Sequence, residues 1–203
     1  MLAENLQEIL RFLRFELCDN STMKKELLKD IPLSDNFIGT VLTKKDPVES
    51  FWKLIVNIII RLRHDYSKLS QEALILFDIL DFDREVINGG FHQYFFNSSG
   101  GRAQMLRKAL LEVNAHITLQ IFEKSLKIFP ENFQFENTDL RQNFLRISTN
   151  SEEAFFAFDV QYEEKIKSRS ICPQKTEDLW QICHKYIETN KDVVISIDTS
   201  IFI

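Results

Sequence analysis

A chain of 203 residues, 44% of them hydrophobic, is long enough to form one sizeable domain with its own core. The net charge of −5 argues against direct binding to nucleic acid, because that affinity depends on Lys and Arg neutralising phosphates. The 18 phenylalanines, against four tyrosines and two tryptophans, favour a thick apolar core over a surface of rings that stacks on bases. The three cysteines form no Cys-x-x-Cys pair, which predicts reduced thiols in a cytoplasmic protein.

Two helices are predicted in the first third of the chain, an amphipathic one at residues 4–17 and a second at about 47–66, whose β-branched run also resembles a buried strand. In residues 4–17 apolar side chains recur on one helical face, and the stretch lacks the basic start and unbroken apolar run of a secretory signal. Asp46 and Pro47 form a helix start, with Asp as the N-cap and Pro at the first helical position. The apolar run at residues 54–60 is too short to span a bilayer, so we expect a soluble protein.

Glycines are concentrated in the middle of the chain, where four of the five lie within residues 89–101. A helix is predicted from Ser70 to about Ile87, ended by Asn88-Gly89-Gly90, because Asn or Gly after the last turn is the usual left-handed cap. A short helix then covers residues 91–97. The next helix runs from about 102 to 128, with a division at Asn114 as an option, and Pro130 ends it.

Two more helices and an alternating tail are predicted in the last third. Residues 150–153 read as a capping box for a helix that ends near Ser168, and the last helix covers about 176–190. In the tail, residues 193–203 alternate with a period of two, as in a β-strand. That strand needs a partner, either residues 37–43 or the same tail of a second subunit.

These elements predict an all-α protein of about seven to nine helices, with the C-terminal tail as an additional strand. No internal repeat or low-complexity linker separates the parts. We expect residues 1–45 to form an N-terminal helical extension and residues 46–203 to form the main helical domain, together as a single compact unit.

The residues around the glycines form a longer pattern. It reads Glu85-Val86-x-Asn88-Gly89-Gly90-Phe91-x-Gln93-Tyr94-Phe95-x-Asn97-Ser98-Ser99-Gly100, followed by Ala109-Leu110 and Ala115. It resembles the signature of the bacterial DNA mimic protein family, whose helical domain was long catalogued as one of unknown function. Two later stretches are similar as well, Phe155-Phe156-x-Phe158-Asp159 with Tyr162 and Lys185-Tyr186-Ile187-x-x-Asn190. The resemblance spans roughly residues 70 to 195.

The resemblance implies an all-helical and often dimeric protein without enzymatic activity or a cofactor. It also implies that acidic side chains take the places of DNA phosphates and so occupy the DNA-binding surface of a transcription factor. Because such mimicry depends on surface acids outside the signature, no functional residue is carried over through the motif. The signature itself consists of Glu85, Asn88, Gly89, Gly90, Phe91, Gln93, Tyr94, Asn97 and Gly100.

The acids of this chain are concentrated in two segments. Duplex DNA carries two charges per base pair, so a net charge of −5 matches only about three base pairs. However, residues 131–164 hold eight acids against two arginines, and residues 72–85 hold five acids against one arginine. Helical spacing places these acids in two stripes, Glu152, Asp159 and Glu163 in the first and Asp78, Asp81 and Glu85 in the second.

Each stripe has an alternative interpretation. The first can be the ordinary solvated face of an amphipathic helix. The second lies on a helix that is apolar nearly all round, so its acids are expected to be buried and paired with Arg84 or Arg102. As candidates for an acidic interaction surface we take Asp78, Asp81, Glu152, Asp159 and Glu163.

The residue spacing gives little support for a metal site, a nucleophile pair or an anion-binding loop. His64, His92, His116 and His184 are too far apart for a helical metal motif, and no metal site is expected. Cys183 and His184 are adjacent on a helix and point in different directions, so a nucleophile pair is unfavourable. Residues 98–102 resemble an anion cradle, but a helix cap and tight turn explain them as well.

The sequence therefore favours a cytoplasmic module that binds a basic protein, such as a transcription factor or another DNA-binding protein, without binding nucleic acid or membrane itself. One alternative is a small-ligand or enzymatic pocket where His92, Gln93, Tyr94 and Asn97 meet the acids of the second stripe. Another is a structural homodimer held by the alternating tail.

Overall fold

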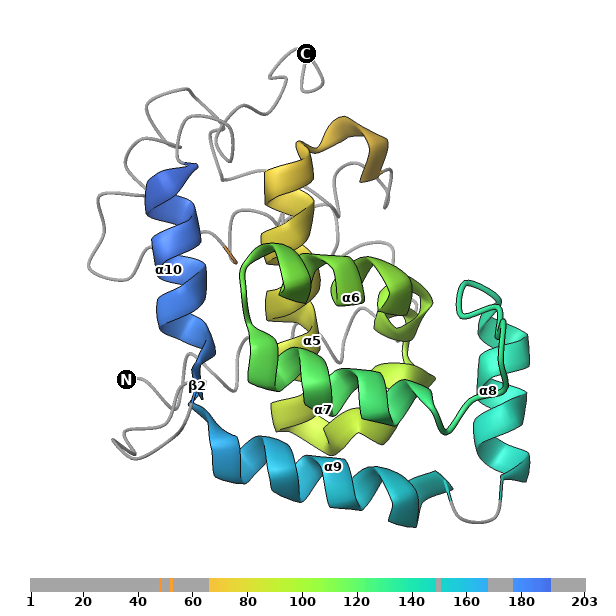
Figure 1. Ribbon diagram of the computed structural model, residues 1–203. Helices are drawn as coiled ribbons and strands as arrows, with labels where there is room; N and C mark the ends of the chain where they lie inside the picture. The colour runs from red at the N-terminus through yellow and green to blue at the C-terminus, as the bar shows by residue number, and fades with distance from the viewer. Residues whose placement is uncertain (1–47, 49–51, 53–65, 149–150, 168–176, 191–203) are drawn as a thin grey trace, which may run out of the picture. The chain divides into compact units, whose positions relative to one another are not determined.

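The computed structural model describes Val48, Trp52 and residues 66–148, 151–167 and 177–190, all within one compact unit of the chain (Figure 1). Val48 and Trp52 are helical and buried, which agrees with the helix predicted at 47–66. The predicted helix at 4–17, the tail and its partner strand lie outside the described residues. The division into an extension and a main domain stays a prediction.

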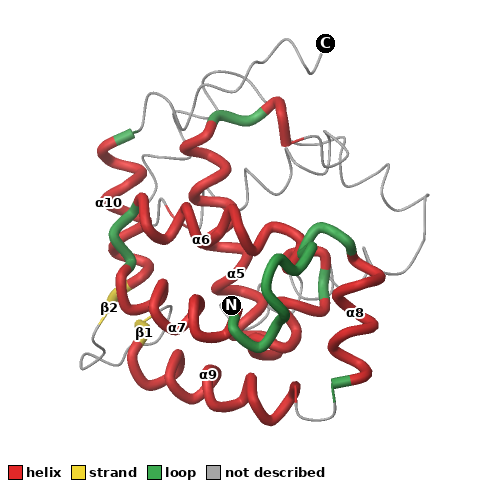
Figure 2. The backbone as a smooth tube through the Cα atoms, turned by 45° about the vertical axis from the view of Figure 1, so that its right-hand side comes forward, coloured by secondary structure: helices red, strands yellow, loops and turns green. Residues whose placement is uncertain are grey.

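The fold is mainly helical, as predicted (Figure 2). The described residues contain six α-helices, two short 3-10 helices (η) and two strands of two residues each. In chain order they are η1 (Tyr66–Lys68), α5 (Gln71–Phe96), η2 (Ser98–Arg102), α6 (Ala103–Glu112), α7 (His116–Leu126), α8 (Thr138–Ile147), α9 (Ser151–Lys165), β1 (Ile166–Lys167), β2 (Glu177–Asp178) and α10 (Leu179–Thr189). Within this part of the chain, no helix combines the length and apolar character needed to cross a membrane.

Helix α5 is the centre of the fold and contacts α6, α8, α9 and η2. Its start is the predicted one, because the Ser70 hydroxyl caps the helix by accepting a hydrogen bond from the Ala73 amide at 3.1 Å. The predicted break at the glycines is also present, as a kink with non-helical backbone angles at Gly89 and Gly90. The predicted short helix at 91–97 is therefore the last part of α5, beyond that kink.

Helices α6, α7 and α9 are layered around α5, and Figure 1 shows α6 and α7 in front of it with α9 running below. The predicted division at Asn114 is confirmed, since this residue has a φ of 60° and separates α6 from α7. Such a left-handed conformation is tolerated by Asn better than by most residues with a side chain. Helix α8 was not predicted, although Asn137 caps it by accepting a hydrogen bond from the Leu140 amide at 3.0 Å.

The core is a cluster of phenylalanine rings, as the composition predicts. Phe95 is fully buried and lies within 5.3 Å of the Phe155 ring and 5.9 Å of the Phe122 ring, measured between centroids. Phe82 forms edge-to-face contacts with Tyr94 and Tyr162. Edge-to-face and offset stacking are the favourable arrangements of aromatic pairs, so these rings hold α5, α7 and α9 together.

The strands β1 and β2 pair in parallel, with Ile166 opposite Glu177. This pairing connects the end of α9 with the start of α10. It also places the Glu177 carboxylate at the start of α7, where it accepts hydrogen bonds at 2.9 Å from the amides of Ile117 and Thr118. A carboxylate at a helix N-terminus satisfies free amides and interacts favourably with the helix dipole.

Candidate functional site

The acids of the second predicted stripe lie along α5 and face η2. Arg102 of η2 donates two hydrogen bonds to Asp78, of which the one from Nη2 to Oδ2 measures 2.9 Å. The predicted pairing of a buried acid with Arg102 is therefore present. The guanidinium of Arg102 also lies 4.4 Å from the ring centroid of Tyr66, in a cation–π contact. Asp78 and Arg102 thus fasten η2 to the first part of α5.

Glu85 holds the signature segment from the other end of the stripe. Its carboxylate accepts hydrogen bonds from Gln93 Nε2 at 2.6 Å, from Asn97 Nδ2 at 2.9 Å and from the Ser99 hydroxyl at 3.3 Å. One carboxylate therefore connects the first part of α5 with the part beyond the glycine kink and with η2. Of the predicted pocket residues, Gln93 and Asn97 are engaged in this way.

Asp81 lies between these two acids on α5. The pKa of Asp81 is raised from 3.8 to about 7, mainly by burial and also by the negative charges of Glu85 and Asp78, while a Ser99 hydrogen bond and the Arg102 charge act in the opposite direction. Burial also raises the pKa of Asp78, although the hydrogen bond and charge of Arg102 act in the opposite direction. For Arg102 itself, burial alone would lower the pKa, but the hydrogen bond and charge of Asp78 raise it overall.

Of the remaining signature residues, Phe91, Tyr94 and Gly100 are buried, whereas Asn88 and Gly89 are exposed. Tyr94 is buried, and burial raises the pKa of its hydroxyl well above the usual value. His92 lies between aromatic rings, with its ring centroid 6.0 Å from that of Phe96 and 6.2 Å from that of Phe155. The acids of the second predicted stripe and the signature residues Gln93 and Asn97 therefore belong to one hydrogen-bond network around the kink.

Asp159 of α9 belongs to this network too. Its Oδ1 accepts a hydrogen bond of 2.7 Å from the Phe91 amide, the first residue after the kink. Gly90 has a φ of 77°, and a Cβ atom there would lie 2.5 Å from the Asp159 carboxylate, so a glycine is needed at this position. Burial raises the pKa of Asp159, while the Phe91 hydrogen bond and the His92 charge lower it.

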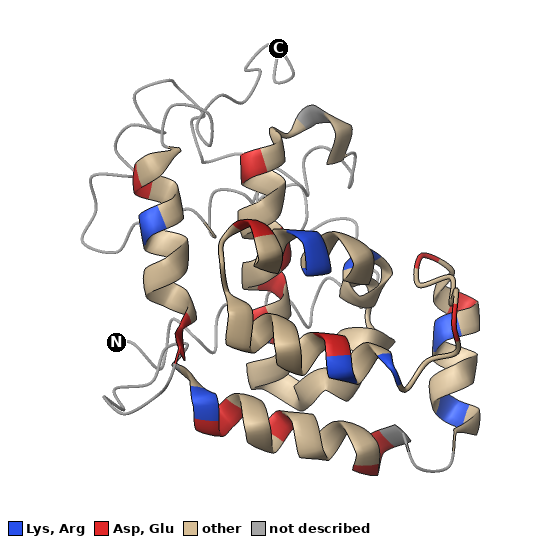
Figure 3. Ribbon diagram, in the orientation of Figure 1, with Lys and Arg blue, Asp and Glu red and all other residues tan. Residues whose placement is uncertain are grey.

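The residues of the first predicted stripe consequently differ in burial, because Asp159 lies at the edge of the α9 face that packs on α5. Asp159 is half-buried and faces α5, whereas Glu152 and Glu163 are exposed. Two acids that were not among the candidates, Glu153 and Glu164, are exposed as well. Figure 3 shows acidic residues toward both ends of α9.

Arg141 of α8, whose role was not predicted from the sequence, lies at the other end of the glycine segment. It is fully buried and donates hydrogen bonds to the carbonyls of Phe135, of Phe95 at 2.6 Å and of Asn97 at 2.8 Å. The last carbonyls of a helix lack partners within the helix, so this guanidinium caps the C-terminus of α5. A Cβ atom at Gly100 would lie 2.9 Å from Arg141 Nε, so Gly100 allows the close approach.

Nothing in the described residues assembles a metal site or an activated nucleophile. No group of three His, Cys, Asp or Glu side chains there is arranged to hold a metal ion. Cys183 is buried in the core, and burial raises the pKa of its thiol, which opposes formation of the reactive thiolate. Its neighbour His184 lies with Nδ1 3.6 Å from the Glu188 carboxylate. The histidine and the cysteine therefore have separate surroundings.

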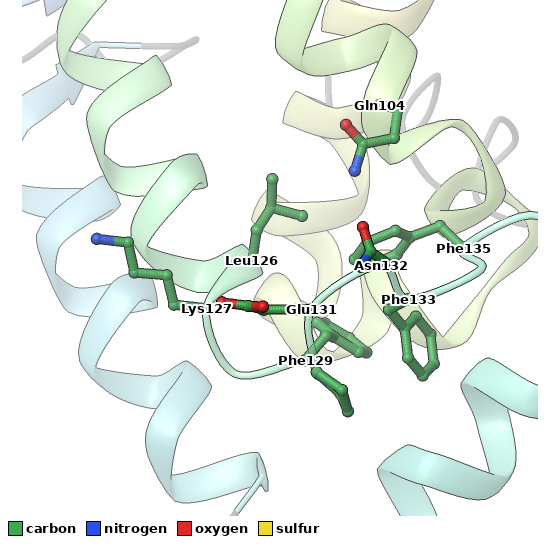
Figure 4. A pocket seen from close by; sticks show the side chains of 9 residues that line it. Gln104, Leu126, Lys127, Phe129, Glu131, Asn132, Phe133 and Phe135 are labelled. Carbon is green, nitrogen blue, oxygen red and sulfur yellow. The ribbon is translucent and has the colours of Figure 1, made fainter.

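An open groove of about 520 Å³ lies away from the signature, beside the loop that follows α7 (Figure 4). Its apolar lining includes Phe129, Phe133 and Phe135, and the Lys127 side chain points away from these rings. Burial of Phe129 and Phe135 assigns these two rings to the core. The groove brings together none of the predicted site residues.

The fold and the network define a mainly helical protein in which internal acids and one buried arginine hold a glycine-rich segment in place. The family model of the DMP19-like proteins matches residues 67–190, which includes the whole signature. The chain therefore belongs to the DMP19-like protein family, as the resemblance to the DNA mimic proteins predicted. Comparison with curated proteins and with solved structures gives no match.

Proposed function

We propose that this chain is a protein-interaction module that binds a basic partner, a transcription factor or another DNA-binding protein, through an acidic surface. Membership of the DMP19-like family supports the proposal. The observation that carries it is the exposed charge of residues 131–164. In this segment seven acids are exposed, whereas Arg146 is the one exposed base, because Arg141 is buried. Folding therefore makes this part of the surface more acidic than the sequence alone suggests.

The surface that we assign is the outer face of α9, defined by Glu152, Glu153, Glu163 and Glu164. The acids of α5 are excluded from it, because they bind Arg102, Gln93 and their neighbours. Asp159 is excluded as well, since its carboxylate accepts a hydrogen bond from the amide of Phe91, the residue after the kink. The proposed surface thus keeps two of the candidates, Glu152 and Glu163, and replaces the others.

Two of these acids occupy positions that stability does not favour. Glu163 and Glu164 lie in the last turn of α9, where the free carbonyl groups give the helix a partial negative charge. Acids there are unfavourable by roughly 0.3–1 kcal/mol each at exposed positions. Helix stability therefore does not explain them, whereas recognition of a basic partner does.

The test is capture of partners from a native bacterial extract by the immobilised chain at low and at high salt. We expect a DNA-binding protein to be retained at low salt and released by added duplex DNA, since exposed ion pairs are screened by salt. The double variant Glu163→Lys with Glu164→Lys should lose this capture. The matched control carries Glu112→Lys and Glu188→Lys, which make the same charge change on α6 and α10.

The control variant should capture as the native chain does. Equal loss in both variants would show that net charge alone matters, and would contradict an assignment to α9. Retention that duplex DNA does not reverse would contradict DNA-like recognition.

Assembly and location complete the proposal. We place the protein in the bacterial cytoplasm, and a homodimer held by its C-terminal tail is the alternative assembly to test. Deletion of residues 192–203 should then lower the mass in solution to that of a monomer, measured by light scattering. An unchanged mass would exclude the tail as the dimer contact.

A further inference from the structure

The outer face of α9 combines its acids with exposed apolar side chains. Seven exposed residues of this helix fall within an arc of about 140° at ~100° per residue. They are Glu152, Glu153, Phe156, Ala157, Val160, Glu163 and Glu164. The acids come as one pair at each end, and the apolar residues lie between the pairs.

Phe156 is the most unusual member of this face. Its side chain is 66% exposed, and Val160, one helical turn further on, is 37% exposed. Among the described phenylalanines, tyrosines and tryptophans, Phe156 is the one with an exposed side chain. The opposite side of α9 already supplies the core with Phe155 and Tyr162, so Phe156 is not needed there.

The spacing of the two acid pairs defines the shape of a partner. They lie 11 residues apart, which is about 16 Å along a helix at 1.5 Å per residue. Duplex DNA carries about ten phosphate charges over that length, whereas this face carries four acids around an apolar centre. The face therefore does not reproduce a row of phosphates. It is complementary to a surface on which cations flank an apolar stripe.

We infer that the outer face of α9 docks a basic amphipathic helix of the partner protein, which covers Phe156 and Val160 with its apolar stripe and pairs cations with the glutamates at both ends. The inference rests on the proposed function and specifies its partner. On such a helix, cations at positions i and i+11 lie within about 20° of each other. Apolar residues at i+4 and i+7 lie between them on the same side. Helix-in-groove and helix-on-helix contacts of this type are a common mode of peptide recognition.

The experiment uses the full chain and two synthetic helical peptides of about 15 residues. The first carries lysines at i and i+11 and leucines at i+4 and i+7. The second has serines in place of the leucines and the same charge. Affinity is measured by fluorescence anisotropy at about 0.05 M and about 0.3 M salt, which separates screened from unscreened contributions.

We expect the leucine peptide to bind at least about tenfold more tightly than the serine peptide, because a covered aromatic anchor dominates such interfaces. Phe156→Ser should weaken binding of the leucine peptide by a similar factor without changing the ratio of the affinities at the two salt concentrations. Ile147→Ser is the matched control, since Ile147 is 78% exposed on α8. It should leave the affinity unchanged. Circular dichroism of both variants verifies that they fold.

Equal binding of the two peptides, no binding of either, or an unchanged affinity of the Phe156→Ser variant would overturn the inference. None of these outcomes affects the proposed function, which is judged by the release of captured protein by duplex DNA. A second copy of the chain is the other occupant to test. If Phe156→Ser lowers the mass in solution without added peptide, α9 is a contact between copies and the inference is wrong.

Discussion

Replacing Asp81 with Asn tests whether the internal acid network limits the stability of the fold. Asp81 lies between Asp78 and Glu85, and its pKa is raised from 3.8 to about 7 by burial and by these two negative charges. Asn has nearly the same shape as the protonated acid, including a group that donates hydrogen bonds. The substitution therefore fixes the side chain in its uncharged form and keeps its packing.

The expected gain in the free energy of unfolding of Asp81→Asn follows from the raised pKa of Asp81. At about 1.4 kcal/mol per unit, the rise from 3.8 to about 7 corresponds to roughly 4 kcal/mol of stability lost when Asp81 ionises. The side chain is half-buried and reached by water, which reduces the expected value to roughly 1–3 kcal/mol. For a chain of this length that corresponds to a rise in Tm of about 2–4 °C per kcal/mol.

The size of the stabilisation by Asp81→Asn depends on pH. Because the folded state holds the Asp81 proton more tightly than the unfolded chain does, the stability due to this proton is fully present below pH 3.8. It declines as the pH rises and is lost above about 7. Asp81→Asn should therefore stabilise the protein strongly at about pH 8.5 and much less at about pH 5.

Urea unfolding followed by circular dichroism at both pH values measures the effect. Glu131→Gln is the control for removing one negative charge, because Glu131 is exposed in the loop between α7 and α8. It should change the free energy of unfolding by less than about 0.5 kcal/mol. Destabilisation of Asp81→Asn at the higher pH would refute the reasoning, since it would mean that the ionised form is the one the fold requires.

Three further substitutions test the contacts that hold the glycine segment and α7, each by urea unfolding. Gly90→Ala should lower the free energy of unfolding by at least about 2 kcal/mol, because φ is 77° and the new methyl group meets the Asp159 carboxylate. Gly101→Ala should lower it by less than about 1 kcal/mol, because the nearest atom to a Cβ there is 3.7 Å away. Arg141→Lys should lower the free energy of unfolding by at least about 2 kcal/mol, since a compact ammonium group cannot reproduce the spread donors of the guanidinium, in which three nitrogens bind three separate carbonyls. The exposed Arg107→Lys should lower it by less than about 0.5 kcal/mol. Glu177→Gln should cost about 1 kcal/mol by weakening the cap of α7. The role assigned to each contact would be contradicted by an unchanged comparison. These outcomes are equal losses of unfolding free energy for Gly90→Ala and Gly101→Ala, equal losses for the two arginine variants, or no loss for Glu177→Gln.

Local signals in the sequence predicted the helix boundaries of the fold well. The cap at Ser70, the kink at Gly89 and Gly90, and the division at Asn114 each depend on residues within one or two turns. Backbone preferences of this kind act through neighbouring residues, so they can be read without the tertiary structure. Helix α8 was missed even though Asn137 provides such a signal.

The contacts that complete the network could not be predicted in the same way, because their partners are distant in the chain. The hydrogen bond from Arg141 to the Phe95 carbonyl joins residues 46 apart, and that from the Phe91 amide to Asp159 joins residues 68 apart. Helical periodicity placed Asp159 beside Glu152 and Glu163. The periodicity could not show that Asp159 lies at the edge of the α9 face that packs on α5. There the amide of Phe91, the residue after the kink, needs a hydrogen-bond acceptor, which Asp159 provides.

The two sides of α9 are therefore under different physical requirements. The inner side is explained by stability, because Phe155 and Tyr162 fill the core and Asp159 caps the residue after the kink. The outer side opposes stability at two points, since Phe156 exposes an aromatic ring to water and the glutamates of the last turn oppose the helix dipole. A partner with an apolar stripe and flanking cations would remove both costs at once. For that reason substitutions on the outer side should weaken binding while leaving the fold intact, and Asp159→Ala, which removes the acceptor of the Phe91 amide, should do the reverse.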